Sequence, residues 1–383
     1  MTRRRLRLTP DRCVLSLLAA EALLGLSDRL GWPAWHKGYA VLAAVASVGL
    51  FFLLMLLWFG AALVFRWRFQ FSIRSLLVLT VAVALPCRWL AAEMRRAEKQ
   101  SEAVKAIGGW GSVIYRGNPQ SGLEPPGPPW LRNVLGDDFL ADVLLASVHD
   151  DAAMQHLKHL TGLETLWLTV SGNDDELGPV NDAGLEHLEE LDQLKELMIY
   201  GSRISEAALR HIGNLSGLRE LDLFEARITG EGLRHIGKLT KLESLNLGNV
   251  QITDRDLGHL QALAQLQWLS LEGTGFTPAG LSHLTGLSRL TVLYVSGEER
   301  ADGRWAHAAL PYLANFTKLT FLWVDGLSGE DVKKLRAALP NCDVNVPQGM
   351  VGYGGSSSSP TSFPTPPAKD GPQTLPAPDQ PGG

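Results

Sequence analysis

The stretch Leu218–Lys241, "LRELDLFEARITGEGLRHIGKLTK", decides the fold because it is one copy of a unit that recurs along the chain. Related units start at Leu163, Leu194, Leu242, Leu266, Leu290 and Leu319. The four units that begin at Leu194 keep a period of 24 residues without slippage. One unit is too short to bury its own apolar face, so neighbouring units are expected to stack on one another.

Each unit combines two hydrophobic periods. Leu221 and Leu223 lie two residues apart, the spacing that places both side chains on one face of a strand. Leu233 and Ile236 lie three apart, so they share one face of a helix. Stacked strands about 4.8 Å apart would form a parallel sheet on the concave side, with the helices outside.

The L-x-x-L-x-L strand, the polar turn and the second apolar segment resemble the leucine-rich repeat family. The resemblance covers about residues 139–346 and implies a solenoid whose return segments are helical, as in F-box-linked repeat proteins. A membrane anchor followed by such repeats is similar to bacterial membrane-anchored leucine-rich repeat proteins of unknown role. The predicted fold class is an α/β leucine-rich repeat solenoid with N-terminal transmembrane helices.

The membrane region is predicted within residues 1–92, which are strongly apolar. Residues 39–65 carry no charge and are long enough to cross a bilayer. Residues 75–92 form a second predicted span, with Arg88 near its end. Residues 13–27 are short and contain Glu21, so this segment either spans the membrane or lies in its interface.

The first segment controls the side of the membrane on which the repeats lie. If residues 13–27 span, the N-terminal arginines share the cytoplasm with the basic loop 66–74, and the repeats are extracytoplasmic. If they do not, the repeats share a cytoplasmic side with Arg95, Arg96 and Lys99. We expect the extracytoplasmic arrangement, because three arginines in one short loop are typical of a cytoplasmic loop.

Caps and a tail complete the organisation. Residues 93–138 are predicted to be an N-terminal cap and linker, with a helix that ends near Gly108 and a strand at "SVIYR" (112–116). "LPNCDVNV" (339–346) is predicted to be the last strand of the stack. Residues 347–383 are rich in Pro, Gly and Ser, a composition typical of disorder.

Six histidines occupy one register of the repeats: His156, His187, His211, His235, His259 and His283. A zinc ion needs several ligands at about 2.0–2.1 Å, whereas neighbouring helix axes lie about 8–10 Å apart. We therefore interpret the column as structural, with each ring near a helix C-terminus. Collective titration of the column remains a second hypothesis. The group around "SVHDDAAMQHLKH" (147–159) aligns with an ordinary repeat segment, which argues against a metal site there.

Composition and motifs exclude several other classes. The net charge of −5 argues against binding to nucleic acid. The chain has three cysteines, Cys13, Cys87 and Cys342, too few and too scattered for a disulfide framework or a metal knuckle. No phosphate-binding loop, nucleophile elbow or dinucleotide fingerprint occurs. We expect no enzymatic activity, no cofactor and no metal.

The concave face is the candidate binding surface. Because side chains alternate along a strand, equivalent residues of successive repeats fall into columns on this face. Its candidate contact residues are Trp167, Met198, Tyr200, Asp222, Phe224, Trp268, Glu272, Tyr294, Phe321 and Trp323. Exposed aromatic residues on a rigid sheet are typical anchors for a protein partner. Alternatively, the insertions "GNDDELGPV" (172–180) and "GEERADGRW" (297–305) fold over these aromatics and bury them.

The predicted function is a membrane-anchored leucine-rich repeat protein that recognises a protein or peptide through its concave face. The predicted partners are that protein or peptide and the lipid bilayer, and not a nucleic acid. The alternative is a structural or adhesive scaffold at the membrane surface without one specific ligand.

Overall fold

A computed structural model describes residues 73–108, 112–116, 129–169, 182–200, 206–226, 228, 230–297 and 303–346. The predicted spans 13–27 and 39–65, the insertion 172–180 and the tail 347–383 lie outside these residues. Among the residues that the structure describes, no helix combines the length and apolar content needed to cross a membrane.

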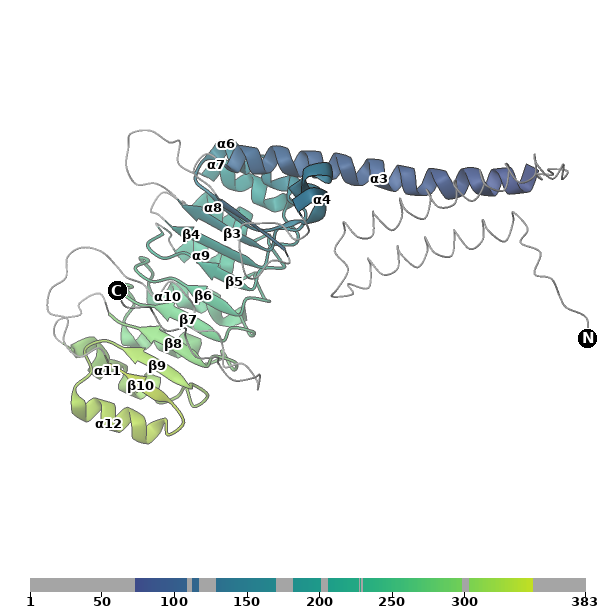
Figure 1. The fold of residues 1–383 in the computed structure, drawn as a ribbon. Helices are drawn as coiled ribbons and strands as arrows, with labels where there is room; N and C mark the ends of the chain where they lie inside the picture. The colour runs from purple at the N-terminus through teal and green to yellow at the C-terminus, as the bar shows by residue number, and fades with distance from the viewer. Residues whose placement is uncertain are drawn as a thin grey trace, which may run out of the picture. The chain divides into compact units, whose positions relative to one another are not determined.

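The described strands form one ten-stranded sheet whose spatial order follows the sequence, from β1 to β10 (Figure 1). Their bounds are β1 Ser112–Tyr115, β2 Val143–Val148, β3 Thr165–Thr169, β4 Glu196–Tyr200, β5 Glu220–Asp222, β6 Ser244–Asn246, β7 Trp268–Leu271, β8 Val292–Val295, β9 Phe321–Val324 and β10 Asp343–Asn345. From β2 onward neighbouring strands pair in parallel, whereas β1 pairs antiparallel with β2. One parallel strand per repeat confirms the predicted solenoid.

The register explains why the leucines decide the fold. One unbroken column joins the middle leucine of every repeat strand: Leu166, Leu197, Leu221, Leu245, Leu269, Leu293 and Leu322. All seven side chains are at most 1% exposed. One continuous hydrophobic core runs from Ala103 near the first strand to Val344 in the last, and Phe139 and Leu140 form a separate small cluster. Each repeat therefore contributes a layer to a core that no repeat could form alone.

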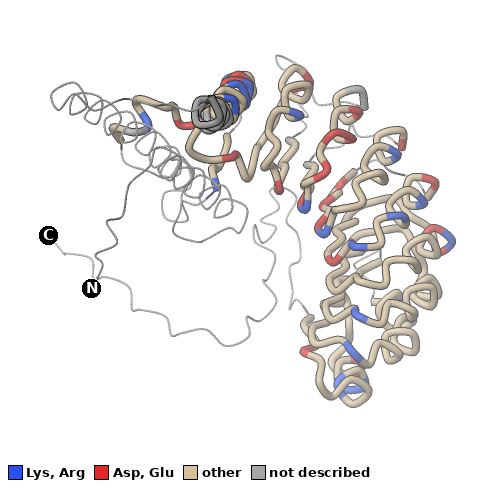
Figure 2. Tube along the Cα trace, turned by 90° about the vertical axis from the view of Figure 1, so that its right-hand side faces the viewer, with Lys and Arg blue, Asp and Glu red and all other residues tan. Residues whose placement is uncertain are grey.

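The return segments are short helices of two kinds. They are α6 Asp151–Met154, η1 Leu157–His159, α7 Asp182–Leu185, η2 Glu186–Glu190, α8 Glu206–Ile212, α9 Gly230–Ile236, α10 Asp254–Leu257, η3 Gly258–Ala262, η4 Pro278–Leu284, α11 Arg304–Leu313 and α12 Gly329–Ala338, with η marking the 3₁₀ helices. Several segments that the sequence predicts as α-helical are thus wholly or partly 3₁₀, the tighter form used in short pieces. Figure 2 shows the return segments along the outer edge of the curved array.

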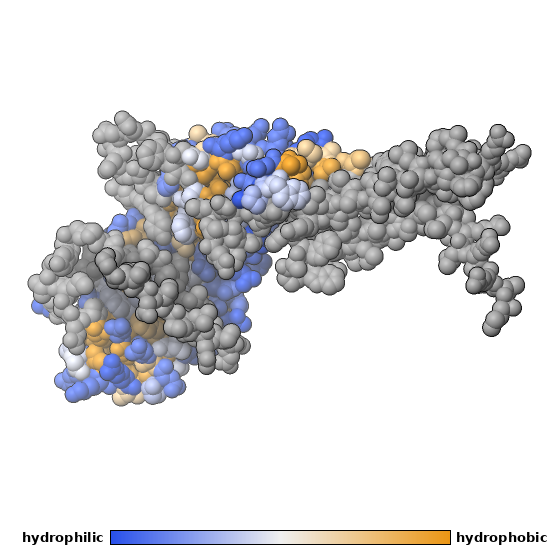
Figure 3. All heavy atoms as spheres, in the orientation of Figure 1, coloured by the Kyte–Doolittle hydropathy of each residue, from blue (hydrophilic) through white to orange (hydrophobic). Residues whose placement is uncertain are grey.

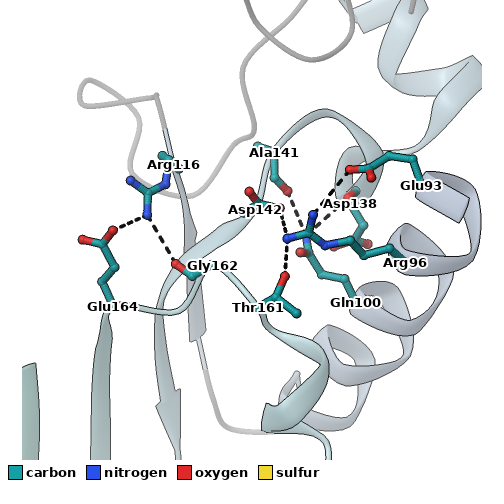
Figure 4. Close-up of polar contacts among 10 residues, drawn as sticks. All are labelled: Glu93, Arg96, Gln100, Arg116, Asp138, Ala141, Asp142, Thr161, Gly162 and Glu164. Atoms are coloured by element: carbon teal, nitrogen blue, oxygen red, sulfur yellow. Dashed lines mark hydrogen bonds and ion pairs between the residues drawn. The ribbon is translucent and has the colours of Figure 1, made fainter. Parts of the chain in front are cut away.

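The N-terminal end of the sheet is covered by helix α3, Ile73–Ile107, which runs through residue 92 without a break. Ala103 and Ile107 on its last turns are buried in the core together with Tyr115 of β1. Short helices α4, Pro129–Leu135, and α5, Asp137–Leu140, follow. The buried amide of Gln100 donates a 2.8 Å hydrogen bond to the Ala141 carbonyl, which fixes α3 to the segment that enters β2 (Figure 4).

Candidate recognition surface

The strand register places eight of the ten candidate concave residues in the columns that the repeat spacing predicts, and Phe224 and Glu272 lie beyond the ends of β5 and β7. The first column joins Thr165, Glu196, Glu220, Ser244, Trp268, Val292 and Phe321. The second joins Trp167, Met198, Asp222, Asn246, Ser270, Tyr294 and Trp323. Each column is a row of neighbouring side chains on one face, so residues far apart in the sequence can form one contact surface.

Four aromatic residues of β7, β8 and β9 meet on this surface, and we call Trp268, Tyr294, Phe321 and Trp323 the aromatic cluster. Tyr294 lies at its centre, with ring centroids 5.5 Å from Trp268, 5.4 Å from Phe321 and 6.2 Å from Trp323. All four side chains are half-buried. Such rings offer a large apolar contact area that is already held in place by neighbouring rings.

Trp167 marks the other end of the concave face. It is 39% exposed and pairs across the sheet with Met198. Five strand spacings separate β3 from β8, which amounts to about 24 Å. Trp167 and the aromatic cluster are therefore two separate anchors that one extended partner could bridge. Tyr200 aligns with Thr169 in the backbone ladder, and its side chain lies outside the described residues.

Asp222 has a bracing role in the middle of the face. Its side chain is 6% exposed, and its carboxylate accepts hydrogen bonds from the Phe224 backbone N–H at 2.9 Å and from Asn246 Nδ2 at 3.1 Å. Asn246 Oδ1 in turn accepts from the Gly248 N–H at 3.0 Å. Burial raises the pKa of Asp222 above its ordinary range. This chain of bonds ties β5 to β6, so we leave Asp222 out of the proposed contact surface.

Phe224 lies two residues after Asp222, beyond the end of β5. Its ring lies over Gly248, where an added Cβ would come within 2.8 Å of Phe224 Cδ2. The side chain is half-buried. A larger residue at position 248 would displace this ring, so the absence of a side chain at Gly248 allows the observed position of the Phe224 ring.

Two acidic residues that are not among the predicted contact residues, Glu196 and Glu220, share the first column with Trp268, with Ser244 between Glu220 and Trp268. Thr165 Oγ1 donates a 2.9 Å hydrogen bond to Glu196, whereas the Glu220 carboxylate has no hydrogen bond or ion pair among the described residues. Partial burial, and then Glu196 and Glu243, raise the pKa of Glu220. Their shared column with Trp268 was a signal in the sequence that could have found them.

A third acid lies near the aromatic cluster itself. Burial raises the pKa of the Tyr294 hydroxyl, and the nearby Glu272 carboxylate raises it further. The concave face thus combines aromatic anchors with negative charge. Chemically, this combination suits an apolar side chain next to a lysine or arginine.

The second insertion ends away from the aromatic cluster. Its Trp305 donates an indole N–H bond of 3.0 Å to the Phe276 carbonyl, and the two rings meet edge to face at 5.4 Å. Phe276 is a buried residue in the turn before η4. Residues 298–302 and the insertion 172–180 lie outside the described residues, so their predicted position over the aromatics stays a prediction.

Five members of the histidine column lie in the last turn of a return helix, as predicted, whereas His156 lies directly before η1. Its members have different partners: His211 Nδ1 is 2.7 Å from Glu189 Oε1, and His283 Nδ1 is 3.4 Å from Gln261 Nε2. In the predicted group at 147–159, Asp150 caps α6 by accepting from the Ala153 N–H at 2.7 Å. Within the described residues, no three such side chains gather closely enough to hold a metal ion.

Comparison with known proteins identifies the repeats. Residues 175–344 match the family model of a leucine-rich repeat region. No curated protein matches the sequence. Among solved structures, an internalin (inlF) from Listeria monocytogenes is 18% identical with a TM-score of 0.29, covering 52% of this chain and 70% of its own. The plant peptide hormone receptor RGFR1 in complex with RGF2 is 16% identical with a TM-score of 0.30, covering 49% of this chain and 33% of the receptor.

Proposed function

Because this chain is a leucine-rich repeat protein, we propose that its concave face recognises a protein or peptide while its N-terminal segment tethers it to a membrane. The observation that carries the recognition is the aromatic cluster, in which three strands present four half-buried rings on one face. Aromatic residues of this kind supply most of the binding energy at protein interfaces.

The charges on the face narrow the chemistry of the partner. Glu220 is half-buried and has no cation as a partner among the described residues. A lysine or arginine beside it would relieve the repulsion from Glu196 and Glu243 that raises its pKa. We therefore propose a partner segment with a large apolar residue for the aromatic cluster and a basic residue for the acidic column.

Site-specific photo-crosslinking tests the recognition. A benzophenone amino acid at Val292, which lies between Trp268 and Phe321 in the first column, should capture a discrete partner in cells. The same probe at Trp130, which is 57% exposed on α4, is the matched control. With the captured partner purified, Trp323→Ala should weaken binding roughly 30-fold or more, the range of an interface hot spot. Equal capture at both positions would favour the scaffold without one specific ligand.

The sequence alone supports the membrane tether and the side of the membrane on which we place the repeats. The uncharged residues 39–65 support the tether, and the arginines of the 66–74 loop support extracytoplasmic repeats. Protease added to intact cells should then digest the repeats. Protection until the cells are lysed would place them in the cytoplasm, and release of the full chain by high salt alone would exclude an integral anchor.

A further inference from the structure

A basic pocket lies where helix α3 meets the first repeat. Its volume is about 340 Å³. Arg95, Arg96 and Lys99 line it from α3, and Lys158, His159 and Thr161 line it from η1 and the following turn. Four permanent cations thus surround a space in which no described lining residue carries a carboxylate. Cationic side chains seldom converge without a counter-charge, since they repel one another.

Arg96 is held in place by its neighbours, whereas the other three cations remain available to bind an anion. Arg96 donates to Thr161 Oγ1 and lies 3.5 Å from the Asp142 carboxylate and 3.8 Å from that of Glu93 (Figure 4). It therefore forms a rigid wall of the pocket. Arg95, Lys99 and Lys158 make no hydrogen bond or ion pair with any residue that the structure describes.

His159 reports the positive potential in the pocket. Partial burial and the charges of Lys99 and Lys158 lower its pKa, while Glu102 opposes them. A neutral imidazole with a hydroxyl beside it can still bond to an anion while the lysines and arginines supply the charge. The lining thus offers both charge and hydrogen bonds to a tetrahedral oxyanion.

The position of the pocket on α3 suggests where such an anion comes from. Ala92 also lines the pocket and is the last residue of the predicted span 75–92. Arg95 and Lys99 follow it on the same helix, about 5 Å and 10 Å farther along the axis. The headgroup layer reaches about 5–8 Å beyond the hydrocarbon core. Figure 3 shows the described surface of α3 changing from hydrophobic to hydrophilic toward the solenoid.

We propose that this pocket binds the phosphate of an anionic lipid headgroup. The lipid source rests on the membrane tether proposed above, whereas the anion chemistry rests only on the pocket. Binding there would hold α3 and the first repeat together at the membrane surface, because the two elements each contribute cations to one ligand.

The test uses the full chain purified in a neutral detergent, with phosphatidylglycerol, phosphatidylcholine and inorganic phosphate as separate probes. Native mass spectrometry should show selective retention of phosphatidylglycerol. A triple variant, Arg95→Gln with Lys99→Gln and Lys158→Gln, should lose about 100-fold in affinity, at about fivefold for each cation removed. The control triple Lys241→Gln, Arg289→Gln and Lys318→Gln loses the same charge at exposed sites in other turns and should change affinity less than threefold.

A fourth variant separates the pocket from bulk charge. Ala92→Tyr fills the pocket and keeps every cation, so it should also abolish retention. It carries the test alone if the triple variant fails to fold. Equal losses of affinity in both triple variants, or full binding by Ala92→Tyr, would contradict binding of the lipid in this pocket. If inorganic phosphate binds as tightly as phosphatidylglycerol, the proposal that the bound phosphate belongs to a lipid would be wrong. None of these measurements depends on the concave face, so a failure here leaves the recognition proposal standing.

Discussion

The rings of Tyr294 and Trp323, on adjacent strands of the concave face, lie 6.2 Å apart with only 29° between their planes. This stacked pair is half-buried, so each ring is supported by its neighbour on one side and remains accessible on the other. Support of this kind lowers the entropy that a partner must remove from the side chains on binding. The two rings are therefore already held against each other before a partner binds.

The stacking should appear as a coupling energy in the free protein. Tyr294→Ala and Trp323→Ala, measured singly and together by urea unfolding, should give an interaction energy of about 0.5–1.5 kcal/mol. A matched cycle with Trp323 and Trp167, on strands far apart, should be additive within about 0.5 kcal/mol. Additivity of Tyr294 and Trp323 would mean that the rings are not packed together in solution.

Glu220 should make stability depend on pH. Its folded-state pKa is raised by burial and by Glu196 and Glu243, so the folded protein holds this proton more tightly than the unfolded chain does. Stability from this group is present at low pH and is lost as pH rises through the raised pKa. Glu220→Gln should therefore be more stable than wild type at pH 7 and equal to it near pH 4. Glu186→Gln, at an exposed carboxylate on η2 that is not among the charges acting on Glu220, should not reproduce that gain.

His235 should have the opposite dependence. Burial, then Lys238 and Arg234, lower its pKa below the ordinary value, with Glu231 and Glu206 opposing. The unfolded chain thus takes up this proton more readily, and stability should fall as pH drops from 7 through the lowered pKa. His235→Gln should remove part of the difference between melts at pH 5 and pH 8, whereas His149→Gln, outside the histidine column, should leave it intact. An unchanged difference in both variants would exclude a contribution from the column.

Gly237 should be indispensable to the stacking of neighbouring repeats. A Cβ at this position would lie 2.4 Å from the His259 carbonyl oxygen, a backbone atom that cannot rotate away. We expect Gly237→Ala to cost about 1–3 kcal/mol of unfolding free energy, as overpacking does. Gly286→Ala is the matched control, because nothing lies within 4 Å of its added Cβ. Similar melting temperatures for the two variants would mean that adjacent return segments separate easily.

Much of the solenoid follows from local pattern alone. The leucine spacing predicts the parallel strands and the concave columns, because alternation along a strand and stacking at a fixed period leave little freedom of register. The distinction between α and 3₁₀ return segments was not predictable in this way. The return segments are only a few residues long, so an α-helix and a 3₁₀ helix differ little over this length. Leu281 and Leu284 of η4 could face the core in either kind of helix.

The candidate surface was predictable as a set of columns but not as a set of roles. The sequence places Asp222 and Trp268 on the same face, and it carries no sign that Asp222 is tied down by Phe224 and Asn246. The sequence also places Glu220 in the column of Trp268, but it does not show that burial and the neighbouring Glu196 and Glu243 raise the pKa of Glu220. How deeply a concave side chain is buried, and which groups it contacts, depend on the side chains that surround it in the folded solenoid.

The sequence by itself determined the repeat, its period, the core leucines and the face on which each concave residue lies, because these depend on spacing along one chain. The tertiary structure decided which rings of that face touch, and it brought Lys99 of α3 beside Lys158 of the first repeat. The ring contacts depend on how large side chains of neighbouring strands orient toward one another, which the repeat period alone does not fix. The approach of Lys99 to Lys158 arises from how helix α3 packs on the first repeat, which no local pattern encodes.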